Sequence, residues 1–145
     1  MRTVLLTSLL PLLLAAFGSN HAYIPSPAAA ASPSALDTSK WYLVKIYSDT
    51  GTIDVTDKYT YIRFDTVAGK AGGKGGCNSF GCSVTTTGTS MKIAKLFSTK
   101  MYCPDRHSAE TSFFYHLQNV TSYTVHENKL VLLVDGIAVL ELLKE

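Results

Sequence analysis

The sequence predicts a mainly β (α+β) fold, a strongly bent antiparallel sheet or partly open β-barrel with one packed α-helix. Three observations predict it. Short apolar and β-branched runs alternate with tight turns, which makes neighbouring strands antiparallel. A single stretch has helical periodicity. No strand–helix–strand repeat occurs, which disfavours a doubly wound α/β fold. We expect bending and the helix to shield the sheet edges.

The composition bounds the class of protein. The chain has 145 residues, of which 46% are hydrophobic and 17% charged, so one domain with a packed core is expected. The formal net charge is +2, and no block of like charge occurs. These charges do not favour nucleic acid or an anionic membrane as a partner. We expect a monomer.

The first 22 residues are typical of a signal peptide. Arg2 precedes an apolar run over residues 3–17, which is short for a membrane span of roughly 20 residues. Cleavage after Gly18 or after Ala22 both fit, and an uncleaved anchor is the alternative. No cysteine lies there, so we expect no Cys-anchored lipoprotein. We predict export to the periplasm, the cell surface or the medium, with no stable membrane span.

The next residues, 23–39, are rich in proline, alanine and serine and predict a linker. The domain is expected over residues 40–145. Residues 40–47 predict its first strand, in which the alternation separates two faces. One face would carry Trp41, Leu43, Lys45 and Tyr47, and the other Tyr42, Val44 and Ile46.

Further strands and turns follow along the chain. Residues 59–65 alternate, with Thr60, Ile62 and Phe64 predicted to face inward. Residues 67–76 hold too much glycine for an ordinary strand interior, and we expect a corner or a presented loop there. Residues 82–88 and 90–97 predict a hairpin that turns at Gly88.

One helix is predicted after Pro104, with Asp105 or Ser108 as its cap. Glu110 would lie in its first turn, where the helix dipole favours an anion. Its apolar stripe comprises Phe113, Phe114, Leu117 and Val120. Strands are predicted at 122–127, 129–134 and 137–143, the last two joined by a hairpin turn at Asp135–Gly136.

The stretch GGKGGCNSFGC, residues 72–82, is the most distinctive motif. It is not a phosphate loop, because Lys74 is followed by glycine and no helix follows the glycines. The cysteines lack C-x-x-C spacing, although Cys103 and His107 could come within reach of each other. No histidine is placed beside Cys77, so thiol catalysis is disfavoured.

Disulfide chemistry accounts better for the three cysteines, because exported domains favour oxidised pairs. One bridge is possible, and 77–103, 82–103 and 77–82 are all open. The glycines would let the backbone turn sharply or approach a neighbouring strand closely. We therefore interpret the motif as architecture.

The order and spacing of several short elements resemble the META domain family, which includes the heat-shock-inducible HslJ-like proteins. The resemblance runs from Trp41 through GCN at 76–78 and STKMYC at 98–103 to NKLVLL at 128–133. It places Cys77 and Cys103 at the two recurring cysteine positions. The family-signature positions are Gly76, Asn78, Thr99 and Met101.

The resemblance implies a β-rich domain in the cell envelope or outside the cell, often linked to stress or drug resistance, with no established enzymatic activity. This chain has Cys82 where the family usually has glycine, which leaves the partner of Cys103 open. We expect Met101 and Phe80 to fill the core. Asn78 is expected to hydrogen-bond its own loop.

We therefore expect an exported, non-enzymatic module for envelope or surface stress tolerance that binds an unidentified protein or a small ligand. No cofactor and no metal is expected. The alternatives are a secreted inhibitor-like binding protein that presents the 67–76 loop, and a small hydrolase or thiol-dependent enzyme that uses a Cys or Ser beside His107 or His116. A filled barrel interior would indicate binding through the surface, and a hollow one would indicate an enclosed ligand.

Overall fold

The computed structural model describes residues 33–37 and 39–145, so the predicted signal peptide and most of the predicted linker lie outside the described residues. A short 3₁₀ helix, η1 (Pro33–Ala35), begins the described part. A second one, η2 (Pro104–Arg106), precedes the single α-helix of the described residues, α1 (His107–Asn119). The strands are β1 (Trp41–Ser48), β2 (Gly51–Asp54), β3 (Thr60–Asp65), β4 (Lys70–Gly75), β5 (Ser79–Thr87), β6 (Ser90–Ser98), β7 (Ser122–His126), β8 (Lys129–Val134) and β9 (Ile137–Lys144).

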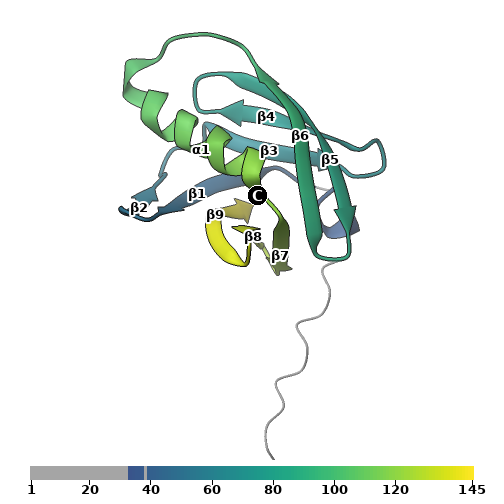
Figure 1. The fold of residues 1–145 in the computed structure, drawn as a ribbon. Helices are drawn as coiled ribbons and strands as arrows, with labels where there is room; N and C mark the ends of the chain where they lie inside the picture. Colours follow the sequence, from purple (N-terminus) through teal and green to yellow (C-terminus); the bar gives the residue numbers. More distant parts are fainter. Residues whose placement is uncertain (1–32, 38) are drawn as a thin grey trace, which may run out of the picture.

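The nine strands of the described part form one bent antiparallel sheet that closes into a partial ring. Their order is β2-β1-β3-β4-β5-β6-β7-β8-β9, and an extra pairing of β1 with β9 joins the two ends. The ring is weakest between β6 and β7, which share a single register pair, Ser90 with Ser122. The predicted partly open barrel is confirmed. Figure 1 shows α1 lying across the sheet rather than beside it.

Large apolar side chains fill the interior of the ring. Trp41, Tyr123 and Phe113 are fully buried, and the Trp41 indole N–H donates to the Leu36 carbonyl at 3.1 Å. The helix places Phe113 and Leu117 in this core and packs against β4, β6, β8 and β9. The helix therefore closes the ring on one side, as its apolar stripe predicted.

The predicted hairpins form with the predicted turns. Strands β5 and β6 meet around Gly88, whose φ is 58°. Strands β8 and β9 meet at Asp135 and Gly136, which have φ of 49° and 83°. Positive φ at both central residues is the backbone that Asp-Gly supplies in two-residue hairpins.

The alternation predicted for the first strand is wrong in its second half. Trp41, Leu43 and Ile46 are buried, because the register against β9 shifts between Leu43 and Lys45. A bulge inserts one residue and moves the following side chains to the opposite face. Ile46 therefore faces the core, and Lys45 does not.

The glycine-rich segment was expected not to be a strand, yet most of it forms β4. Gly73 pairs with Ile62 on one side and with Phe80 on the other. A Cβ at Gly73 would collide with the Tyr61 carbonyl oxygen. Glycine thus serves here to let two strands approach closely, which the absence of side chains permits.

Two further boundaries differ from the sequence prediction. The fold starts before Lys40, because Leu36 is fully buried and Asp37 accepts two hydrogen bonds from Thr66. Neither Asp105 nor Ser108 caps α1. Its N-cap residue is Arg106, which makes no side-chain cap, because η2 leads directly into the helix.

Candidate functional site

The family-signature residues meet at one corner of the sheet, where β4 turns into β5 at residues 76–78. Of the three pairings that the sequence left open, the structure contains Cys77–Cys103, with the two Cα atoms 6.0 Å apart. This bridge ties the corner to the segment that precedes α1. Gly76 has a φ of 113°, a conformation that side-chain-bearing residues rarely adopt. Arg106 Nη1 donates to the Gly76 carbonyl at 3.3 Å.

A buried carboxylate holds this corner from the helix side. Glu110 is 6% exposed, and its Oε2 accepts the backbone N–H groups of Cys77 at 3.0 Å and Asn78 at 2.6 Å. Its Oε1 accepts the side-chain amide of Asn78 at 2.6 Å. Hydrogen bonds that a charged group accepts from a tight turn stabilise the turn strongly. The corner is therefore bound to α1 by hydrogen bonds as well as by the disulfide.

Asn78 joins the corner to the strand end on its other side. Its Oδ1 accepts the Thr99 hydroxyl at 2.8 Å and the Met101 backbone N–H at 2.7 Å. Its Nδ2 also lies 3.1 Å from the Met101 carbonyl. The expected bond of the Asn78 side chain to its own loop is therefore not seen, because its partners Glu110, Thr99 and Met101 all lie in other segments. Gly76, Asn78, Thr99 and Met101 form one connected unit.

The prediction for Met101 is wrong, although that for Phe80 is confirmed. Phe80 is 6% exposed, whereas Met101 is 59% exposed. Only the Met101 backbone bonds Asn78, so its side chain is left to solvent. Met101 therefore does not fill the core, as the sequence had predicted it would.

Sequence reasoning also missed the role of Glu110, which it placed in the first helical turn for its charge alone. The spacing of residues in the sequence does indicate that Glu110 is buried. Glu110, Phe113, Phe114 and Leu117 follow a 0, 3, 4, 7 spacing, which puts the carboxylate on the buried stripe. A charge on the apolar face of a helix requires partners, and the N–H groups of the corner are those partners.

The remaining cysteine has no exposed thiol. Cys82 is buried and free, and burial raises the pKa of its thiol to about 11. Its Sγ lies 3.6 Å from the Ala71 carbonyl oxygen. At neutral pH this thiol is protonated, and protonated thiols are poor nucleophiles. Within residues 33–37 and 39–145, no group of three or more metal-ligating side chains is found.

A concave surface lies away from the corner, between α1, the β1–β2 turn and the β8–β9 hairpin. We call it the helix groove. Its volume is about 600 Å³, within the range of small-molecule sites. It is lined by Tyr47, Ser48, Asp49, Tyr115, His116, Asn119, Val134, Asp135, Ile137, Ala138 and Val139.

The electrostatics of the helix groove are set by the carboxylates of Asp49 and Asp135 and by the neutral imidazole of His116. Burial lowers the pKa of His116, and the Asp49 charge opposes that shift only partly. The Tyr47 hydroxyl donates to Glu141 at 2.9 Å, and burial together with that carboxylate raises the pKa of Tyr47. The groove therefore presents negative charge at neutral pH.

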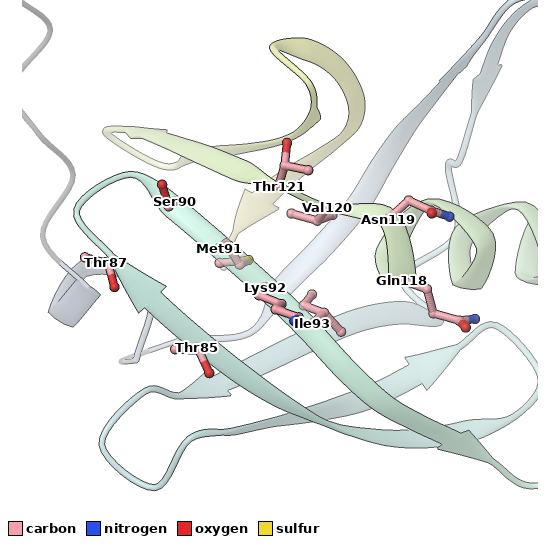
Figure 2. Close-up of a pocket in the computed structure, with 10 residues that line it drawn as sticks. All are labelled: Thr85, Thr87, Ser90, Met91, Lys92, Ile93, Gln118, Asn119, Val120 and Thr121. Atoms are coloured by element: carbon pink, nitrogen blue, oxygen red, sulfur yellow. The ribbon is translucent and has the colours of Figure 1, made fainter.

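A second hollow lies where β6 and β7 separate, and its volume is about 520 Å³. Figure 2 shows side chains from β5, β6, the end of α1 and the two residues between α1 and β7 around it. Met91, Ile93 and Val120 are buried and belong to the core. The other lining residues are short polar side chains, a glutamine and one lysine, Lys92. This hollow offers a ligand less apolar surface than the helix groove.

The sequence of the chain matches a known protein family. The family model described as the META domain matches residues 34–145. The chain belongs to the META domain family. The match begins at Ser34, in agreement with the buried Leu36. No sequence among curated proteins matches the chain.

Two solved structures are similar to this chain in fold. An NMR structure of a protein from Burkholderia xenovorans is 20% identical with a TM-score of 0.67, and the alignment covers 91% of this chain and 99% of that one. A second NMR structure is 16% identical with a TM-score of 0.57, covering 78% of this chain and 95% of that one. At these identities the likeness concerns the fold alone. Among the described residues, no helix has the length and apolarity needed to cross a membrane.

Proposed function

We propose that this META-domain protein is an exported, non-enzymatic binding module that acts in envelope or surface stress tolerance and engages a protein or small ligand at its outer surface. The filled interior carries this proposal. Among the described residues, twelve large side chains with under 2% exposure belong to the core. Concave surfaces of ligand size lie outside this core, the helix groove among them.

Two observations support the export part of the proposal. The sequence begins with a pattern typical of a signal peptide. The Cys77–Cys103 bridge is compatible with an oxidising compartment, where such bonds persist. Expression of the full chain, followed by cell fractionation and amino-terminal sequencing, tests this part. An intact Met1 on protein retained in the cytoplasm would contradict export.

The binding part is tested by two-dimensional NMR of the ¹⁵N-labelled domain, titrated with a small set of aromatic amines, alcohols and acids. We expect shifts that concentrate on surface residues of the helix groove, such as His116 and Ile137. The indole N–H of Trp41, buried and bonded to Leu36, serves as the interior reporter. Shifts centred on Trp41 would place the ligand inside the ring and overturn surface binding. An absence of shifts with every probe would also count against the proposal.

The thiol-enzyme alternative finds no support in the geometry. Cys77 and Cys103 are consumed by the disulfide, and Cys82 is buried with a raised pKa. The inhibitor-like alternative relied on a presented loop at residues 67–76, yet residues 70–74 of β4 are paired with both β3 and β5. The serine form of the enzyme alternative stays a hypothesis: Ser48 lines the helix groove together with His116, and its hydroxyl donates to the Gly51 carbonyl at 2.8 Å.

A further inference from the structure

The helix groove carries a pattern of charge and apolar surface that selects a class of ligand. We propose that it binds a small amphiphilic organic cation, in which an ammonium group is attached to an apolar or aromatic body. This inference rests on the proposed surface-binding function and adds the chemistry of the ligand.

The charges in the groove all have one sign. Asp49 comes from the β1–β2 turn and Asp135 from the β8–β9 turn, and among the described residues no lysine or arginine lines the groove. The whole chain carries a net charge of +2, so this acidic pair differs from the average surface. A cation between the two turns is attracted by both carboxylates, whereas an anion is repelled by both. Since both residues are exposed, the attraction is modest and sensitive to salt.

The apolar part of the groove fits the body of such a ligand. Val134, Ala138 and Val139 provide aliphatic surface from the β8–β9 hairpin. Two large apolar side chains are exposed at the groove, Tyr115 at 65% and Ile137 at 71%. Exposed apolar groups gathered at one concavity mark a binding surface more often than scattered ones do.

Aromatic rings can add to the attraction for a cation. Tyr47 and Tyr115 both line the groove, and a cation within about 6 Å of such a ring is attracted by its π face. The Tyr47 ring is held by its hydrogen bond to Glu141. Lys45 Nζ already lies 5.9 Å from the Tyr47 ring, but it is paired with Asp54 at 3.7 Å. Tyr115 has no such competing cation among the cation–ring contacts of the described residues.

His116 makes the preference depend on pH. The titratable groups that line the groove with it are Asp49, Asp135, Tyr47 and Tyr115. With its pKa lowered by burial, the imidazole is neutral at pH 7 and does not repel a cation. On acidification it gains a proton and adds a positive charge beside the carboxylates. Affinity for the cation should then fall, while affinity for a neutral analogue should not.

The test compares three probes of nearly the same shape: 4-phenylbutylamine, 4-phenylbutanol and 4-phenylbutyrate. Each is titrated into the labelled domain at pH 7 and low salt, and NMR shifts of His116 and Ile137 report binding. With about threefold from each exposed carboxylate, we expect the amine to bind roughly tenfold more tightly than the alcohol. The acid should bind more weakly than the alcohol. High salt should remove most of this difference.

The variant D49N/D135N tests whether the carboxylates set the preference. Asparagine tolerates positive φ, so the turn at Asp135 can keep its backbone. We expect this variant to bind amine and alcohol within about twofold of each other, with alcohol binding unchanged. D105N is the matched control, since Asp105 is exposed and lies before the opposite end of α1. It should retain the full preference.

The outcomes separate this inference from the function it rests on. Equal binding of amine and alcohol to the wild type, or a preference for the acid, would overturn the cation inference while leaving surface binding in place. An undiminished preference in D49N/D135N would overturn the role of the two carboxylates. If none of the probes shifts the groove residues, the groove is not a ligand site and the inference fails with it.

Discussion

Replacing Glu110 by glutamine should destabilise the domain far more than one charge removed from a surface would. The carboxylate receives three N–H donors, at 3.0, 2.6 and 2.6 Å. Glutamine retains one acceptor oxygen, which can face the backbone donors of Cys77 and Asn78. Its amide nitrogen must then face the Nδ2 group of Asn78, and two donors are opposed in a buried site.

Asn78 cannot relieve this conflict by rotating its amide. Its Oδ1 is already committed to Thr99 and the Met101 N–H, so a flip would break those bonds. Losing one charge-assisted bond and weakening two others costs about 3 kcal/mol. For a domain of this size, that corresponds to a fall in Tm of about 10–15 °C.

The measurement is urea unfolding followed by Trp41 fluorescence, with the disulfide intact. Trp41 is the single tryptophan and is fully buried, so its emission reports the core. E127Q makes the same chemical change at an exposed turn residue and should lie within about 0.5 kcal/mol of wild type. If E110Q lies as close to wild type as E127Q does, the assignment of Glu110 as the anchor of the corner is refuted.

A double-mutant cycle tests the donor–acceptor pattern directly. N78D alone opposes two carboxylates, while N78D combined with E110Q lets the glutamine amide donate to the introduced carboxylate. That carboxylate would still accept from Thr99 and Met101 but would lose the bond to the Met101 carbonyl. We expect the double variant to cost at least about 1 kcal/mol less than the sum of the single ones. Additive costs would contradict the proposed geometry.

Four further predictions follow. Replacing Cys77 and Cys103 by serine should reduce the free energy of unfolding by about 3.5 kcal/mol, the chain-entropy estimate for a bridge that spans 26 residues; an unchanged urea midpoint would contradict it. Cys82 should resist iodoacetamide in the native state and react after denaturation, because the buried thiol has a pKa of about 11; rapid native labelling, detected by mass spectrometry, would show an open site. Alanine at Gly75 should cost about 1–3 kcal/mol in urea unfolding, because its Cβ would lie 2.5 Å from a phenyl carbon of α1, whereas alanine at a free position would cost little. His116 has a folded pKa below its unfolded value, so the folded state disfavours its protonation. Its contribution to stability is constant above pH 6.5 and decreases as pH falls toward the folded pKa. The H116N variant should therefore show a flatter dependence of Tm on pH in that window.

Local patterns were sufficient for most of the strands and for both hairpin turns. Alternation at Thr60, Ile62 and Phe64 predicted their burial, because a strand that faces a core on one side needs that period whatever its partner is. Asp135–Gly136 predicted a hairpin because the preference for positive φ belongs to the residues themselves. The order of the short motifs also pointed to the META domain, which the family match over residues 34–145 shows.

The tertiary structure alone decided features that depend on residues far apart in the chain. The bulge that turns Ile46 inward comes from pairing with β9, and the place of Gly73 in a strand depends on how closely β3 approaches. Likewise Glu110 holds the corner only because folding brings the backbone N–H groups of Cys77 and Asn78 to the helix. The helix groove, with Asp49 and Asp135 on two separate turns, exists only once the ring has closed. A local sequence records the conformational preferences of its own backbone and its apolar period, whereas close approach, hydrogen-bond partners and concave surface are properties of segments brought together by folding.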